Sequence, residues 1–293
     1  GVINETSLLN ALHSGHVAAA GIDTWEVEPP RDNPFSQLPQ VVMSPHIGAS
    51  TSEAQIRIAE SIATQVPRAL RGEVVDFPVN MPSVKVLPTS PVRHYTTLVE
   101  KMGMFSSQFL DFQPNHLEIK YRGSLSKWDT SLLRLCFLKG FLQAAHDHAS
   151  YVNADQLAES VGLHVAEDID PGFTDYESAF KCCFKLKGKQ FTIGGVVFSG
   201  PHPRITLIND FVCELEASGT MLVTTNSDKP GMIGVIGVCL GKHQININQF
   251  ELGRNVRGGE AMAVISVDQD ISKDILDELI SNDGIISVRK IVL

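Results

Sequence analysis

The chain has 293 residues, of which 43% are apolar and 19% are charged, and its formal net charge is -9. This length and composition predict a globular protein with two or three domains. The acidic balance argues against a protein that binds nucleic-acid phosphates, and no apolar run approaches the roughly 20 residues of a membrane helix. Five cysteines without a C-x-x-C pair favour free thiols. We therefore expect a cytoplasmic protein with neither nucleic-acid nor membrane partners.

The first 50 residues have the pattern of a parallel α/β sheet. Leucines at helical spacing predict a helix within residues 4–15. Two short apolar runs, residues 17–22 and 41–43, lack alternation, which is typical of parallel strands covered on both faces. Polar groups, Asp23 and the His46 turn, follow these runs. In open parallel sheets ligands bind at that edge.

The middle of the chain predicts a long helix, a linker and an α+β domain. The helix covers residues 52–70, and prolines at 82, 88 and 91 indicate the linker. Helical and β-like patterns then alternate. The expected helices are residues 89–110, 132–146 and 153–161, and the expected strands are residues 117–121, 179–187, 191–198 and 205–215.

The last 75 residues predict a ferredoxin-like βαββαβ unit. Its expected elements are strands at 221–225, 245–252, 261–267 and 285–292 and helices at 230–240 and 272–280. We expect four segments in all. They are a remnant of a doubly wound nucleotide-binding domain (1–50), a helix and linker (51–80), an intervening α+β domain (81–218) and the βαββαβ unit (219–293).

His46 is the leading candidate for chemistry. A histidine placed at random is more often a core or cap residue, but this one follows a strand and precedes a turn and a helix start. A carboxylate bonded to its ring would fix the tautomer and raise the pKa, as a general base near neutral pH requires. On spacing alone, either Glu26 or Glu28 could supply that carboxylate.

Two segments, residues 19–29 (AAGIDTWEVEP) and 44–51 (SPHIGAST), resemble the NAD-dependent D-2-hydroxyacid dehydrogenases. The resemblance implies that His46 is the catalytic acid/base and that Glu28, just before the proline, is its partner. It also implies that Asp23 meets the nicotinamide carboxamide. The expected cofactor contacts are Asp23, His46, Ile47, Gly48 and Ala49.

The C-terminal unit resembles an ACT domain, a small amino-acid sensor, in the segments 228–231 (DKPG) and 245–247 (INI). The resemblance implies effector contacts at Asn226, Asp228 and Asn246. An acceptor such as Asp228 could hold an effector ammonium group, and Asn246 could reach it from a facing chain. The alternative is a βαββαβ unit with a purely structural role.

The combination of domains resembles the long-form D-3-phosphoglycerate dehydrogenases, a subfamily of the D-2-hydroxyacid dehydrogenases. Segments 151–154, 197–200 and 203–205 resemble their intervening domain, and Arg204 is either an anion contact there or a solvated surface residue. The resemblance implies NAD as cofactor, D-3-phosphoglycerate as substrate, serine as effector and a homo-oligomer. The alternatives are another ACT-containing D-2-hydroxyacid dehydrogenase and a regulatory or oligomerisation module without catalysis.

We also expect an N-terminally truncated portion, inactive by itself. The family's substrate-binding arginine and Gly-rich phosphate loop would precede Gly1, and no G-x-G-x-x-G follows a strand in these residues. No metal site is predicted, because His146 and His148 are two residues apart and do not share a helix face.

Overall fold

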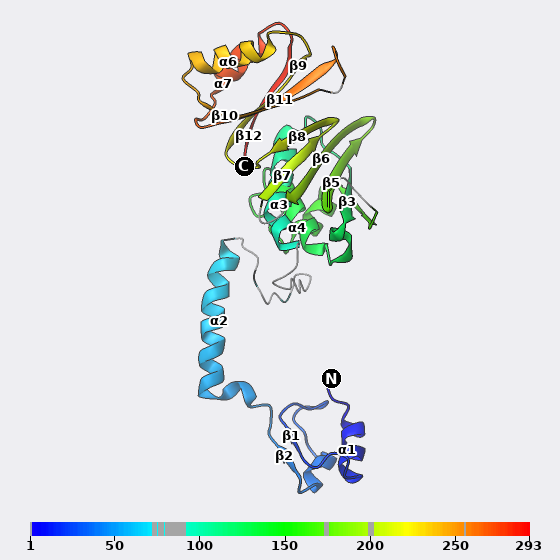
Figure 1. Ribbon diagram of the computed structural model, residues 1–293. Coiled ribbons are helices and arrows are strands. Elements are labelled where there is room, and N and C mark those ends of the chain that lie inside the picture. Colours follow the sequence, from blue (N-terminus) through cyan, green and yellow to red (C-terminus); the bar gives the residue numbers. More distant parts are fainter. Residues whose placement is uncertain are drawn as a thin grey trace. The chain divides into compact units, whose positions relative to one another are not determined.

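The structure is a computed structural model that describes residues 2–71, 75, 79, 92–172, 176–198, 202–254 and 256–293. The chain divides into two compact units, Gly1–Val75 and Asp76–Leu293, whose elements are labelled in Figure 1. Most of the predicted linker, with its prolines, and the first three residues of the predicted helix 89–110 lie outside the described residues.

The first unit is a small α/β arrangement, as predicted. Strands β1 and β2 pair in parallel, with Ala20 opposite Val41. The chain enters α1 through an N-cap, where Asn4 accepts a hydrogen bond from the Ser7 backbone. The elements are α1 (Glu5–His13), β1 (Ala20–Ile22), a 3₁₀ turn η1 (Pro34–Gln37), β2 (Val41–Met43), a second 3₁₀ turn η2 (Gly48–Ser50) and α2 (Ser52–Leu70).

One face of the β1–β2 pair carries the core of this unit. Leu12, Trp25 and Phe35 are buried, and Ile22 and Met43 pack against them. The expectation of strands covered on both faces is wrong within this unit, because Val42 on the opposite face is 74% exposed. The apolar residues of α2 are likewise exposed within the unit.

A six-stranded sheet dominates the first part of the second unit, in the order β4-β3-β5-β6-β7-β8. Helix α3 packs on this sheet and against α4 (Figure 1). Gly103 and Gly140 permit the close helix contact, since a Cβ at either would overlap the backbone of the other helix. The elements are α3 (Val92–Phe109), β3 (His116–Gly123), a 3₁₀ turn η3 (Ser124–Lys127), α4 (Ser131–Leu142), α5 (Ala154–Ser160), β4 (His164–Asp170), β5 (Ser178–Leu186), β6 (Lys189–Phe198), β7 (His202–Ile208) and β8 (Phe211–Leu215).

Three predictions for this domain need correction. Strand β4 was not predicted, because it is a polar strand at the sheet edge and lacks the alternation that marks a half-buried strand. The expected strand 205–215 is two strands, β7 and β8, since the chain turns at Asn209 with a positive φ of 52°. The expected helix 132–146 ends at Leu142, four residues early.

The C-terminal residues form a four-stranded antiparallel sheet in the order β10-β11-β9-β12. Helices α6 and α7 contact each other and contribute apolar side chains to one core with the strands. Gln108 of α3 exchanges two hydrogen bonds with the backbone of Val292, which connects this sheet to the preceding domain. The elements are β9 (Thr220–Ser227), α6 (Met232–Lys242), β10 (Ile247–Arg254), β11 (Glu260–Val267), α7 (Lys273–Ile280) and β12 (Ile285–Val292).

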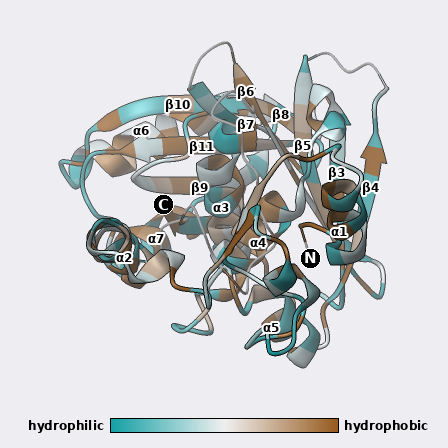
Figure 2. Ribbon diagram, turned by 90° about the horizontal axis from the view of Figure 1, so that it is seen from below, coloured by the Kyte–Doolittle hydropathy of each residue, from teal (hydrophilic) through white to brown (hydrophobic). Residues whose placement is uncertain are grey.

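Figure 2 colours these elements by the hydropathy of each residue, from teal for hydrophilic to brown for hydrophobic. None of the described helices combines the length and apolar character that a membrane span requires. All five cysteines are free thiols.

Candidate functional site

His46 lies three residues beyond the end of β2 and has a positive φ of 61°, a conformation that histidine adopts more readily than most residues. Its side chain is 55% exposed. The ring Nδ1 lies 2.9 Å from Glu28 Oε2. Because an ionised carboxylate can only accept, the neutral ring carries its proton on Nδ1 and keeps a lone pair on Nε2. The exposed nitrogen is therefore the basic one.

Glu28 is itself held in place by the loop that follows β1. Its Oε1 accepts a hydrogen bond of 3.0 Å from the Trp25 backbone N–H. The indole Nε1 of Trp25 donates at 3.0 Å to the Ser44 carbonyl, two residues before His46. Trp25 is buried against Phe35. The loops after β1 and β2 are thus joined at the level of the histidine.

The His46–Glu28 pair shifts the titration of both groups. The hydrogen bond to Glu28, and then its charge, raise the pKa of His46 above its ordinary value of 6.5. The hydrogen bond from His46, followed by the bond from the Trp25 backbone, lowers the pKa of Glu28 below 4.5. A raised pKa makes the neutral imidazole a stronger base, which suits a group that must accept a proton.

Asp23 lies at the end of β1 and anchors the turn that carries His46. Its Oδ1 accepts from the Ser44 hydroxyl at 2.6 Å and from the Ile47 N–H at 2.8 Å, and its Oδ2 accepts from the Gly48 N–H at 2.8 Å. These three bonds lower the pKa of Asp23. A carboxylate has about four acceptor positions, so one remains for a ligand. A Cβ at Gly48 would lie 2.8 Å from Asp23 Oδ2, which explains the glycine there.

Glu26, the other carboxylate that spacing allowed, faces away from His46. Its backbone N–H donates to Glu5 Oε1 at 2.7 Å, and its own Oε1 accepts from the Glu5 N–H at 3.2 Å. These two reciprocal hydrogen bonds hold the start of α1 against the loop after β1. The tertiary structure therefore places Glu28 beside the histidine and gives Glu26 a structural contact.

A second group of predicted residues lies around a hollow of about 510 Å³ between β9, α6 and β10. Asn226 is 2% exposed, and its Oδ1 has no hydrogen-bond partner among the described residues. Asp228 Oδ2 accepts from the Gly258 N–H at 2.8 Å and lies 3.5 Å from Arg254 Nη1. The structure thus brings Asn226 and Asp228 together.

Asn246, the third expected effector contact, does not line this hollow. It precedes β10, where its Nδ2 donates to Asp268 Oδ2 at 2.6 Å and its N–H donates to Gln269 at 2.7 Å. Arg204, the candidate anion contact, lies on β7 and donates to the Pro203 carbonyl at 2.9 Å, with Glu216 at 3.7 Å. Within one chain, neither residue joins the other predicted contacts.

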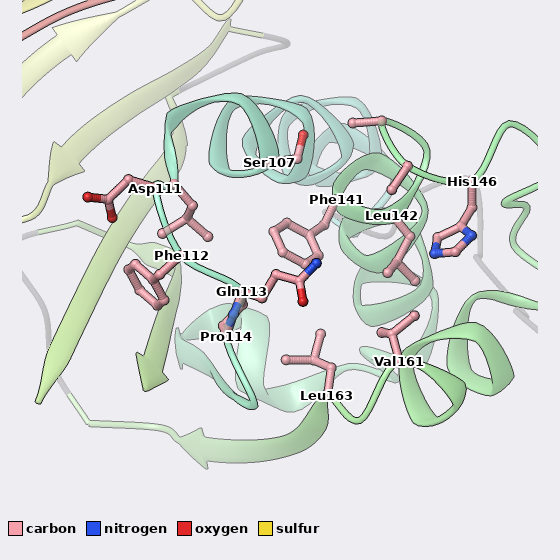
Figure 3. A pocket seen from close by; sticks show the side chains of 13 residues that line it. Ser107, Asp111, Phe112, Gln113, Pro114, Phe141, Leu142, His146, Val161 and Leu163 are labelled. Atoms are coloured by element: carbon pink, nitrogen blue, oxygen red, sulfur yellow. The ribbon is translucent and has the colours of Figure 1, made fainter. Parts of the chain in front are cut away.

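A further hollow of about 470 Å³ in the intervening domain was not predicted. Figure 3 shows Phe141 of α4 and Gln113 of the α3–β3 loop beside it, with His146 at its rim. Its residues come from the end of α3, the end of α4 and the segment after α5, which are distant in sequence. No local pattern in the sequence marks such a site.

Two family models match parts of the chain. The family model of the D-isomer specific 2-hydroxyacid dehydrogenase NAD binding domain matches residues 1–48, and that of the D-3-phosphoglycerate dehydrogenase intervening domain matches residues 91–209. The matched residues 1–48 include the His46–Glu28 pair, so this pair lies in a segment similar to the NAD binding domain of the D-2-hydroxyacid dehydrogenases. The prediction of NAD as the family's cofactor is confirmed by this match.

Relatives named D-3-phosphoglycerate dehydrogenase match essentially the whole chain. The protein from Bacillus subtilis is 33% identical over 100% of this chain and 56% of its own length. Those from Methanocaldococcus jannaschii and Mycobacterium leprae are 32% and 34% identical, over 95% and 96% of this chain and 53% of their own lengths. Along its whole length, the chain matches the C-terminal portion of these D-3-phosphoglycerate dehydrogenases. It spans about half of their length.

Proposed function

We propose that the protein catalyses the NAD-dependent oxidation of D-3-phosphoglycerate to 3-phosphohydroxypyruvate, the first step of serine biosynthesis. The observation that carries the proposal is the 2.9 Å contact between His46 Nδ1 and Glu28 Oε2. It leaves Nε2 as a proton acceptor in an exposed position at the strand ends. The names of the relatives supply the substrate, and the chain's own residues supply the base.

His46 takes the hydroxyl proton of the substrate at Nε2, while the Glu28 carboxylate stabilises the imidazolium that forms. When bound at this edge, NAD would supply the acceptor for the hydride of the substrate C2. The residues at the strand ends fit this cofactor. Asp23 keeps one acceptor position for a carboxamide, and Ile47, Gly48 and Ala49 form an exposed turn that a nicotinamide can approach.

The test is His46→Ala in the complete protein, assayed with NAD and D-3-phosphoglycerate. A positioned acid/base contributes about 10²–10⁴ in rate, so turnover should fall by that factor. His13→Ala is the matched control, since His13 is an exposed histidine at the end of α1 in the same unit. Unchanged turnover in His46→Ala contradicts the proposal.

A second candidate function is a regulatory or oligomerisation module that has no catalysis of its own. The observation that favours it is the βαββαβ order of the C-terminal unit, β9-α6-β10-β11-α7-β12. Calorimetric titration of this chain with NAD separates the two functions, because tight binding contradicts a module without cofactor. A third candidate, another ACT-containing D-2-hydroxyacid dehydrogenase, predicts a higher kcat/KM for a different 2-hydroxy acid.

We also propose that the C-terminal unit is an ACT domain of ferredoxin-like topology that binds serine. Its element order, β9-α6-β10-β11-α7-β12, supports this, as does the hollow that Asn226 and Asp228 line. The unpaired Asn226 Oδ1 and the Asp228 carboxylate are acceptors suited to an ammonium group. Asn246 would then contribute from the facing chain of a homo-oligomer.

Serine should therefore raise the melting temperature of the chain, and Asp228→Ala should abolish the increase. Asp277 is an exposed aspartate on α7, and Asp277→Ala should leave the increase in melting temperature intact. A chain that shows no serine-dependent stabilisation has a C-terminal unit with a structural role only.

A further inference from the structure

Three side chains of different metal-binding character meet between helices α6 and α7. They are the Cys239 thiol, the His243 imidazole and the Glu278 carboxylate, and their ligand atoms all lie within 4.8 Å of one another. Cys239 lies in the last turn of α6, and His243, four residues on, is the C-cap residue of that helix. Glu278 comes from the last turn of α7. This cluster lies outside the hollow that Asn226 and Asp228 line.

We propose that Cys239, His243 and Glu278 bind a zinc ion. Zinc prefers sulfur, imidazole nitrogen and carboxylate oxygen in a tetrahedral arrangement, and this cluster offers one of each. With bonds of about 2.0–2.3 Å, a tetrahedral zinc holds its ligand atoms roughly 3.3–3.8 Å apart. His243 Nε2 and Glu278 Oε2 are now 2.8 Å apart, so these two atoms must separate slightly to bind zinc.

The charge around the cluster suits a divalent cation. A Cys239 thiolate and the Glu278 carboxylate together neutralise a doubly charged ion. The C-terminal end of α6 adds the partial negative charge of its last carbonyl groups. Lys242 Nζ lies 2.8 Å from Glu278 Oε1, the oxygen that does not face His243. The lysine can therefore keep this ion pair while zinc takes Oε2.

A position for a fourth ligand is also present. A hollow of about 310 Å³ borders Cys239, Lys242, Glu278 and Asn282. It is large enough for a water molecule, which is the usual fourth ligand where three protein side chains bind zinc. Local sequence patterns do not reveal this cluster, because Glu278 lies 35 residues beyond His243 and joins it only in the folded chain.

The test is zinc titration of the reduced, metal-stripped chain in competition with a chromophoric chelator. We expect one equivalent of zinc per chain, and Cys239→Ser should weaken binding at least tenfold. Cys213→Ser is the matched control, since Cys213 lies on β8 and contacts the Ile205 carbonyl instead. His243→Ala should also weaken binding, whereas His164→Ala, at an exposed position on β4, should not.

Substoichiometric binding, or equal affinity in the Cys239→Ser and Cys213→Ser chains, overturns the proposal. Circular dichroism of each metal-free variant establishes that it is folded before titration. If Cys239→Ser does not fold, cobalt substitution of the unaltered chain decides the question. A thiolate-to-cobalt charge-transfer band is expected in the near ultraviolet, and its absence refutes the site.

Discussion

The hydrogen bonds around Glu28 predict what a neutral amide would do in its place. Each carboxylate oxygen faces a donor, His46 Nδ1–H on one side and the Trp25 backbone N–H on the other. Glu28→Gln keeps one acceptor oxygen and presents an NH₂ group to the other donor. If the Trp25 bond is kept, the NH₂ group faces Nδ1, and the ring must accept there. The proton then moves to Nε2, so the ring can no longer act as a base at its exposed nitrogen.

The expected decrease in turnover follows from the loss of a positioned base. Turnover of the complete protein should fall by about 10²–10⁴ in Glu28→Gln. In this chain, the tautomer can be read directly from long-range ¹H–¹⁵N spectra of the His46 ring. We expect the Nδ1-protonated form in the unaltered chain and the Nε2-protonated form in Glu28→Gln. The pKa of His46 should also fall, because the hydrogen-bonded negative charge that raises it has been removed.

Glu26→Gln is the matched control, since it makes the same chemical change two residues away at a carboxylate bonded to Glu5. It should leave both the tautomer and the pKa of His46 unchanged. Two results would refute the reasoning. One is an Nδ1-protonated ring with an unshifted pKa in Glu28→Gln, and the other is an equal effect of both substitutions.

Three further predictions concern stability. The His46–Glu28 pair should stabilise the first unit most between pH 4.5 and 6.5, the ordinary values of the two groups. The contribution of His46 to stability is lost as pH rises through its raised pKa. The contribution of Glu28 is lost as pH falls through its lowered pKa. The free energy of unfolding should therefore depend less on pH in Glu28→Gln. Gly140→Ala places a methyl group against the α3 backbone and should destabilise the second unit by about 1–3 kcal/mol in urea unfolding. The control is Gly237→Ala, in open space on α6, which should be neutral or stabilising. Tyr95→Phe removes the hydroxyl that bonds both the Ser178 carbonyl and the Val197 N–H. It should lower the free energy of unfolding by about 1–3 kcal/mol in the same measurement. An unchanged free energy would mean that water replaces the hydroxyl.

Local patterns in the sequence were sufficient to predict many of the elements. The parallel pair β1–β2 was predicted from short apolar runs, and α2 from its apolar periodicity, because both signals arise between residues close in the chain. The polar edge strand β4 and the turn at Asn209 were missed. A polar edge strand has little alternation, and one turn residue inside an apolar run is a weak signal.

The sequence by itself determined that His46 follows one strand and that Glu26 and Glu28 follow the neighbouring strand. Spacing left both glutamates open, and the family resemblance implied Glu28. The tertiary structure gives the physical reason, since the indole of Trp25 joins the two loops and Glu28 contacts His46 while Glu26 binds Glu5. The Cys239, His243 and Glu278 cluster was decided in the same way, by the packing of α6 against α7. Spacing along a chain limits which side chains can meet, whereas burial and long-range hydrogen bonds select the ones that do.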